Sequence, residues 1–225
     1  MSCLALLSLR RTLSTAIMLL TGAAAILRAA PLPPGSLLSP APYEAGPLGA
    51  TLVLSTNVSF VAPFAFSGTL TTRIWTNDAS SPFSSGLTFT YELTLDANPS
   101  AQPVSRLTIS SYGGFLADAS YTNGTSGFGI APLSIGRNPA GDVVRFNFED
   151  LFGNPTLVQG TNSTLLVIQT DAPWYQPTVA GVIDGATANV FSYAPSVIPE
   201  PSPVTVAGAS ILLLLLYRRW VRGSS

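Results

Sequence analysis

The sequence feature that most constrains the fold is a two-residue alternation of apolar and polar side chains. In residues 87–95 the odd positions carry Leu, Phe, Tyr, Leu and Leu, whereas the even positions carry Thr and Glu. Residues 66–74 alternate in the same way, with Ser, Thr and Arg on the polar side. Because successive side chains of a strand point to opposite faces, this period predicts β-strands with one dry face and one wet face.

Clusters of turn residues separate the apolar runs of the middle of the chain, for example Asn123–Gly124 and Asp184–Gly185. The middle shows no convincing amphipathic helix. About eight strands are predicted, at residues 51–60, 66–74, 87–95, 106–111, 128–135, 143–148, 165–170 and 189–193. Short strands with turns between them predict an all-β fold, an antiparallel β-sandwich, although a jelly roll and an open barrel fit the same pattern.

Charge is unevenly distributed along the 225 residues. All ten basic residues are arginine, and the net charge is −1. Residues 31–199 keep four of the arginines and ten acidic residues, so this middle part has a net charge of −6. An acidic domain without a basic stripe argues against nucleic acid as a partner.

The N-terminus is typical of a secretory signal peptide, which we expect to form a helix within residues 1–30. A basic pair, Arg10–Arg11, precedes an apolar run at residues 12–27, and small residues follow at Ala29–Ala30. The alternative is a buried N-terminal helix, which the prolines after residue 30 would end abruptly. Residues 31–47, rich in Pro, Gly, Ser and Ala, are predicted to be a linker to an ectodomain at residues 48–195.

The C-terminus predicts a membrane-spanning helix at Val204–Trp220. The segment carries no charge before Arg218, and its seventeen residues would span about 26 Å as a helix. A basic end follows the apolar run, with Arg218, Arg219 and Arg222. The positive-inside rule places these arginines in the cytoplasm and the ectodomain outside. A buried core helix is the alternative.

Just before this helix lie Pro199, Glu200 and Pro201, within residues 198–202. A Pro-Glu-Pro motif, an apolar helix and a basic end resemble the tripartite sorting signal of PEP-CTERM proteins, although Trp220–Val221 interrupts the basic cluster. The resemblance implies that residues 196–225 are a sorting tail, recognised in the inner membrane by an exosortase-type sorting protease and cut near the motif. It also implies delivery to the cell surface or the extracellular matrix, often alongside exopolysaccharide.

The middle of the chain is similar to the β-rich ectodomain common in that family. The matching stretches are residues 86–91, 143–148, 166–171 and 182–185. They carry no known activity with them.

The composition excludes several kinds of catalytic site. The chain has no histidine and no lysine, and its one cysteine, Cys3, lies in the predicted signal peptide. A Ser-His-Asp triad, a Schiff base and thiol chemistry are therefore excluded from the mature domain. A pair of carboxylates could still serve glycoside hydrolysis, but Glu149 and Asp150 would point to opposite faces of a strand, and Glu92 stands alone on its face. We predict no enzyme and no cofactor.

Two kinds of ligand remain as hypotheses. Calcium would suit the oxygen-rich turns at Asp96–Asn98 and Asn77–Asp78, or Asp171 and Asp184 if their segments are neighbours; the alternative is that these side chains cap their own turns, and we predict no metal site. Carbohydrate would suit Trp174 and Tyr175 in a predicted loop, with Trp75 and Tyr112 at strand ends. Aromatic side chains of β proteins more often pack in the core or at its rim.

The leading hypothesis from the sequence is an exported structural or interaction protein of the cell surface or matrix. The second is a carbohydrate-binding module retained in secreted polysaccharide, and an enzyme comes third.

Overall fold

The computed structural model describes residues 30–44, 46–98, 101–123 and 129–198, and this part of the chain is all-β, as the sequence predicts. The described residues form no helix that is long and apolar enough to cross a membrane. The strands are β1 (Ala30–Pro31), β2 (Leu37–Leu38), β3 (Thr51–Ala62), β4 (Phe66–Thr76), β5 (Thr88–Leu95), β6 (Arg106–Ile109), β7 (Ala117–Thr122), β8 (Ser134–Arg137), β9 (Val144–Asn147), β10 (Leu165–Thr170), β11 (Trp174–Asp184) and β12 (Ala186–Ser196).

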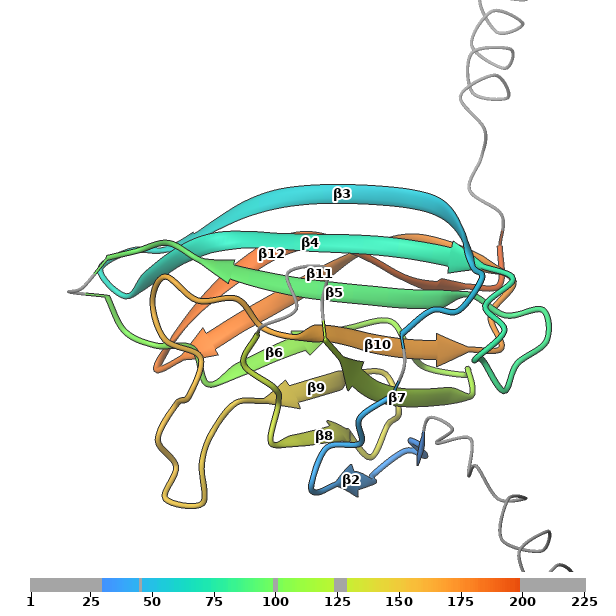
Figure 1. Ribbon diagram of the computed structural model, residues 1–225, viewed down its shortest axis with the longest axis horizontal. Coiled ribbons are helices and arrows are strands. Elements are labelled where there is room, and N and C mark those ends of the chain that lie inside the picture. Colours follow the sequence, from blue (N-terminus) through green and yellow to red (C-terminus); the bar gives the residue numbers. More distant parts are fainter. Residues whose placement is uncertain (1–29, 45, 99–100, 124–128, 199–225) are drawn as a thin grey trace, which may run out of the picture.

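These strands form two six-stranded antiparallel sheets that pack face to face (Figure 1). The first sheet, sheet A, has the order β1-β7-β10-β5-β4-β3, and the second, sheet B, has the order β12-β11-β6-β9-β8-β2. The sandwich-like architecture predicted from the alternation is thus confirmed. Residues 1–29 of the expected signal peptide (residues 1–30) and residues 199–225 of the expected sorting tail (residues 196–225) lie outside the described residues.

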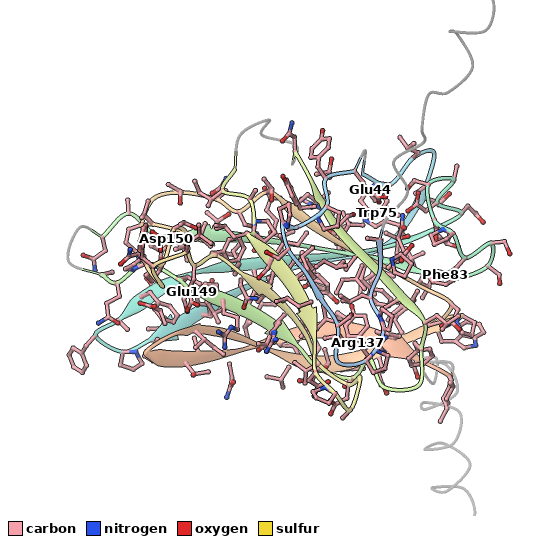
Figure 2. All side chains as sticks on the ribbon, turned by 90° about the horizontal axis from the view of Figure 1, so that it is seen from below. Glu44, Trp75, Phe83, Arg137, Glu149 and Asp150 are labelled. Carbon is pink, nitrogen blue, oxygen red and sulfur yellow. The ribbon has the colours of Figure 1, made fainter. Side chains whose placement is uncertain are left out.

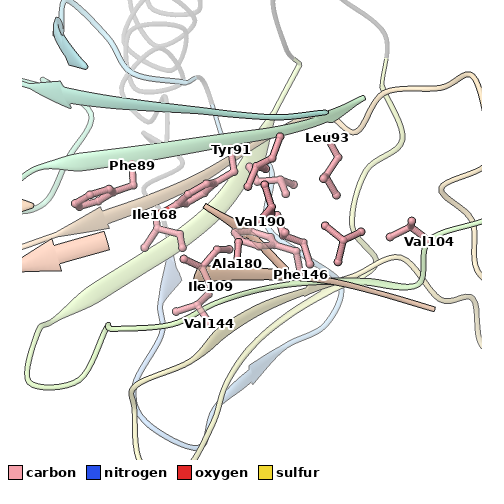
Figure 3. Close-up of a cluster of buried hydrophobic side chains, with 14 of the residues drawn as sticks. Phe89, Tyr91, Leu93, Val104, Ile109, Val144, Phe146, Ile168, Ala180 and Val190 are labelled. Atoms are coloured by element: carbon pink, nitrogen blue, oxygen red, sulfur yellow. The ribbon is translucent and has the colours of Figure 1, made fainter. Parts of the chain in front are cut away.

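The core lies between the two sheets, where the apolar side chains of the alternating strands meet (Figure 3). Phe89 and Ile168 come from sheet A, whereas Ile109, Phe146 and Val190 come from sheet B, and all five are buried. Burying side chains of this size stabilises a fold by about 1.5–3 kcal/mol each. Since residues 30–198 contain no cysteine, no disulfide stabilises this part of the chain, and its stability depends on this core.

Three tyrosines connect the sheets through hydrogen bonds inside the core. Tyr91 of β5 donates to the carbonyl oxygen of Tyr193 in β12 at 2.8 Å. Because this bond uses the one hydroxyl proton of Tyr91, the 2.8 Å contact between the Tyr91 and Tyr112 hydroxyls requires Tyr112 to be the donor. Burial raises the pKa of both phenols, and each hydroxyl therefore stays protonated.

The structure differs from the predicted strand list in three places. The strand expected at residues 128–135 is β8, which begins only at Ser134. β7 is not predicted from the sequence, because its core-facing residues Ala117 and Ala119 are small. β11 is not predicted either, because Pro177 and Gly181 interrupt its pattern. At Pro177 the strand pairs with β12 alone, because the pairing of β11 with β6 begins only at Ala180, so the lost N–H is tolerated.

Residues 31–44, predicted as part of a linker, belong to the fold. They contribute β1 and β2 and bury Leu32 and Ala41 in the core. A buried arginine, Arg137, holds this segment in place by donating to the carbonyl oxygen of Leu32 at 3.1 Å and of Gly141 at 2.7 Å. Local composition cannot reveal this, because the partners that order the segment lie far away in the sequence.

The two described chain ends lie at the same end of the sandwich (Figure 1). Residues 31–34 and residues 196–198 both lie around the turn at Gly114–Phe115. The β3–β4 turn and the long loop between β9 and β10 lie at the opposite end, and Figure 2 shows this separation through Glu149 and Asp150 at one end and Phe83 at the other. The domain therefore has a proximal end, where the chain enters and leaves, and a distal end.

Candidate functional site

A segment that we call the strap, residues 46–50, crosses the outer face of sheet A. It comes from the β7 side, where Gly46 donates its N–H to Thr122 Oγ1 at 3.2 Å. Leu48 then donates its N–H to Asp78 Oδ1 at 3.0 Å, and β3 begins at Thr51 on the far edge of the sheet. The strap therefore covers polar side chains that the alternation predicts to face water.

Asp78 is the anchor beneath the strap. Its carboxylate accepts hydrogen bonds from the Leu48 N–H, from Ser80, from Thr88 Oγ1 at 2.8 Å and from Gln169 Nε2 at 3.1 Å. Burial raises the pKa of this carboxyl, but the hydrogen bonds outweigh burial, so the pKa lies below its usual value. A charged Asp78 thus ties the strap to β5 and β10.

Two further acids lie buried at the β7 side of the strap. Glu44 accepts a hydrogen bond from Ser120 Oγ at 3.1 Å, and its other carboxylate oxygen has no partner among the described residues. Burial raises the pKa of Glu44 to about 7, and nearby Asp118 and Asp78 add to that rise. Burial also raises the pKa of Asp118 to about 6. These two carboxyls therefore titrate near neutral pH.

Beside the strap lies an open pocket of about 370 Å³, which we call the strap groove. Its lining residues are Gly46, Pro47, Leu48, Arg73, Trp75, Thr122, Asn123 and Leu165. Arg73 and Trp75 both lie on β4 and, two positions apart, face the same side of the sheet. The groove thus crosses sheet A from β4 to β7, and Glu44 and Trp75 in Figure 2 mark its neighbourhood.

A hydrogen bond and an ion pair with neighbouring residues hold the side chains of Trp75 and Arg73 in place. Trp75 donates its indole N–H to Thr90 Oγ1 at 3.0 Å, which fixes the ring on the sheet. Arg73 Nη1 lies 3.5 Å from Glu92 Oε2 on the adjacent strand β5. An aromatic ring next to a guanidinium held in place by its ion pair suits recognition of a hydroxylated ligand. None of the described lining residues is acidic, so the pair of carboxylates that glycoside hydrolysis needs is not present in this lining.

The structure places the two aromatic residues predicted for carbohydrate at the start of β11, not in a loop. Trp174 is 46% exposed, and Tyr175, the next residue along the strand, points to the other face. Tyr175 packs edge-on against Tyr193, with ring centroids 5.7 Å apart. The two rings therefore do not share one groove.

The acids considered for calcium do not converge. Asp171 precedes β11 and Asp184 ends it, and a strand of eleven residues separates them by about 33 Å. The expectation that they meet is wrong, because β10 leads directly into β11 at the proximal end. Among the described residues, no group of three Asp, Glu, Cys or His side chains could hold a metal ion.

Two other acids proposed from the sequence are occupied by structural contacts. Glu149 lies 3.9 Å from the Arg106 guanidinium. Asp150 accepts the N–H groups of Phe152 and Asn154, each at 2.8 Å, and so caps a turn. The two residues lie in the loop after β9 and not on a strand, so strand alternation does not decide their orientation.

One sequence pattern indicates part of the strap groove. Extending the alternation of residues 66–74 by one residue puts Trp75 on the polar face beside Arg73. A large aromatic residue on the wet face of a strand indicates a ligand or a covering segment. The covering strap had no such signal, because its contacts with Thr122 and Asp78 are distant in the sequence.

Comparisons with known proteins add nothing to this geometry. No protein-family model, no curated protein and no solved structure matches the chain. Function must therefore be inferred from the residues of this chain. The sorting motif Pro199, Glu200 and Pro201 and the basic end at Arg218, Arg219 and Arg222 lie outside the described residues.

Proposed function

We propose that the protein is exported and held at the cell surface or in the extracellular matrix, where its β domain serves as a structural or interaction module. The observation that carries this proposal is the difference between the two ends of the described domain. Its chain ends lie at the proximal end, whereas its most exposed large apolar side chains lie at the distal end. A tail anchored at the proximal end would present those side chains outward.

The distal loop between β9 and β10 supports this proposal. Leu151 is 97% exposed and Phe152 is 89% exposed. The two Asp150 hydrogen bonds hold the turn that carries them, and Gly153 at φ +79° completes it. Exposing two apolar side chains to water is unfavourable, and these two side chains contribute no packing to the core. Such exposed apolar tips are typical of contact sites for a partner.

Phe64, at the β3–β4 turn, is a second apolar tip. The side chain is fully exposed, and its φ of 63° lies in the left-handed region, which is rare for a bulky residue. Left-handed backbone costs about 1–2 kcal/mol for a residue other than glycine. The fold gains no buried area from Phe64, so a role outside the fold explains its presence better than packing does.

In this proposal, the C-terminal tail directs the protein to the cell surface. Its order of motif, apolar helix and basic end resembles the PEP-CTERM signal, so an exosortase-type sorting protease is the proposed processing partner and the inner membrane the proposed intermediate location. Surface exopolysaccharide is the proposed surrounding material. No catalytic role is proposed, since the two glutamates considered for one, Glu92 and Glu149, each pair with an arginine.

Changing the motif tests this route. In the source organism, we expect a variant with alanine at Pro199, Glu200 and Pro201 to stay in the membrane fraction, whereas Ser202→Ala reaches the surface or the medium. Equal surface delivery of the two variants would contradict the sorting role. The interaction role is tested separately by Leu151→Ser/Phe152→Ser, which we expect to release the protein from the matrix into the medium.

Carbohydrate binding is a second candidate function, and one observation favours it. The strap groove combines a fixed indole, a fixed guanidinium and an exposed amide, those of Trp75, Arg73 and Asn123, on one open face. An interaction module of the matrix would have such a groove if it binds the polysaccharide itself.

A further inference from the structure

The strap groove has the size and extent of a site for a chain of sugar rings. It crosses four strands, from β4 through β5 and β10 to β7. Three spacings between neighbouring strands make about 14 Å, which is longer than one sugar ring. Its 370 Å³ lies within the range of small-ligand sites, and the pocket is open to solvent. A linear polymer fits such a groove better than a compact molecule does.

Trp75 supplies the surface on which a sugar ring can stack. Its indole N–H is already bound to Thr90, so the ring cannot turn edge-on without losing that bond. The apolar walls formed by Pro47, Leu48 and Leu165 exclude water from the faces of a bound ring. Aromatic stacking contributes about 0.5–1.5 kcal/mol beyond the area that it buries.

Arg73 supplies hydrogen-bond donors to the groove. Its guanidinium lines the groove and offers several N–H groups, and the buried Glu92 on the neighbouring strand, which lies outside the lining, holds it in place. Sugar hydroxyls can accept hydrogen bonds from these N–H groups. Asn123 adds an exposed amide at the rim of the groove.

Charge decides which class of polysaccharide fits. Glu92 neutralises the charge of Arg73, so the described lining residues offer no unpaired positive charge to an anionic ligand. The surrounding domain is acidic, and Glu44, Asp78 and Asp118 lie at the strap. Polyuronates and sulfated polymers are therefore repelled.

We propose that the strap groove binds a neutral polysaccharide, which stacks on Trp75 and bonds through its hydroxyls to Arg73 and Asn123. This proposal rests on the carbohydrate-binding function proposed above and assigns that function to the strap groove. A second aromatic group, formed by Tyr175, Phe191 and Tyr193 on the outer face of sheet B, suits this ligand less well. Its neighbouring rings stand at 79° and 84° to each other, so they do not form a flat platform.

Affinity electrophoresis of the purified full-length chain tests the proposal. The gels contain dextran, a mixed-linkage β-glucan, a galactomannan or alginate as probes. We expect at least one neutral polymer to retard the wild-type protein and alginate not to do so. Absence of retardation by every neutral polymer, or retardation by alginate alone, would overturn the proposal.

Matched variants locate the site. We expect Trp75→Ala and Arg73→Ala each to weaken binding about tenfold, a loss of about 1.4 kcal/mol, while Trp75→Phe retains part of it. The controls Trp174→Ala and Arg106→Ala remove a more exposed indole and another acid-paired arginine, both outside the groove, and we expect these variants to bind as the wild type does. Thermal unfolding of each variant checks that it is folded.

A different pattern among the variants would refute the groove as the site. If Trp174→Ala or Phe191→Ala abolishes retardation while Trp75→Ala does not, the ligand lies on sheet B. Surface delivery is measured independently through the Pro199–Pro201 variant. A protein that reaches the surface but binds no neutral polymer would therefore refute the groove and leave the exported interaction role intact.

Discussion

Arg137 donates a hydrogen bond to the carbonyl oxygen of Tyr112 at 2.6 Å, inside the proximal end of the sandwich, where Arg137 is only 2% exposed. The same guanidinium bonds to the carbonyl oxygens of Phe115, Leu32 and Gly141. One side chain thereby joins the N-terminal segment, the turn before β7 and the β8–β9 turn. Burial lowers the pKa of Arg137, although the group remains charged.

Arg137→Met is expected to lower the free energy of unfolding by about 3–5 kcal/mol, because it leaves four carbonyl oxygens without their donor in a buried place. Urea unfolding measures this. The control is Arg145→Met, since Arg145 Nε has no hydrogen-bond partner in the described part of the chain. Equal losses for the two variants would show that the Arg137 bonds do not stabilise the proximal end.

Stability should fall as the pH rises from about 4.5 to 7. Glu44 and Asp118 have usual values of 4.5 and 3.8, and burial raises their folded pKa to about 7 and about 6. The folded state therefore binds more protons than the unfolded state in this range. Each group lowers the free energy of unfolding by at most about 1.4 kcal/mol per pH unit, Asp118 only up to about pH 6 and Glu44 up to about pH 7. The lowered pKa of Asp78 acts in the opposite direction, at a pH below its usual 3.8.

Urea unfolding at several pH values tests this titration. Glu44→Gln keeps an acceptor for Ser120 but cannot ionise, so we expect a flatter dependence between pH 4.5 and 7. The control, Glu149→Gln, removes a half-exposed carboxylate elsewhere. A stability that rises with pH across this range in the wild-type protein would contradict the buried state of the two acids.

Phe64→Gly is expected to make the domain more stable by about 0.5–1 kcal/mol, because glycine adopts a φ of 63° without strain. For a chain of this size that raises the melting temperature by about 1–4 °C. Phe64→Ala keeps the strain and should leave the melting temperature unchanged. If the glycine variant is less stable than the wild type, Phe64 makes contacts that explain its presence without a partner.

Gly86→Ala is expected to destabilise the domain severely, by more than about 3 kcal/mol. A methyl group at this position would lie 1.6 Å from the carbonyl oxygen of Thr170, a backbone atom that cannot move aside cheaply. Gly113→Ala is the control, since its methyl group would meet nothing closer than 3.5 Å. Similar melting temperatures for the two variants would contradict the close approach of residue 86 to the end of β10.

The all-β fold was predictable because the alternation in β4 and β5 is local and regular. The predicted linker, by contrast, is part of the domain: Leu32 and Glu44 are ordered by Arg137, Ala117 and Tyr121, and composition carries no information about such distant partners. Only part of the candidate site was predictable from the sequence. The period of β4 places Trp75 on the outer face, but the strap that builds the groove around it follows only from the three-dimensional path of residues 46–50.

Mass spectrometry of the mature protein tests the central claim most directly. The protein is recovered separately from the cell envelope and the culture medium of its source, and its C-terminal residue is determined. Export and sorting predict a C-terminus near Pro199–Ser202, with the leucine-rich segment removed. A chain intact through Ser225 and retained in the membrane fraction would contradict the sorting role and would make the protein a single-span anchored domain.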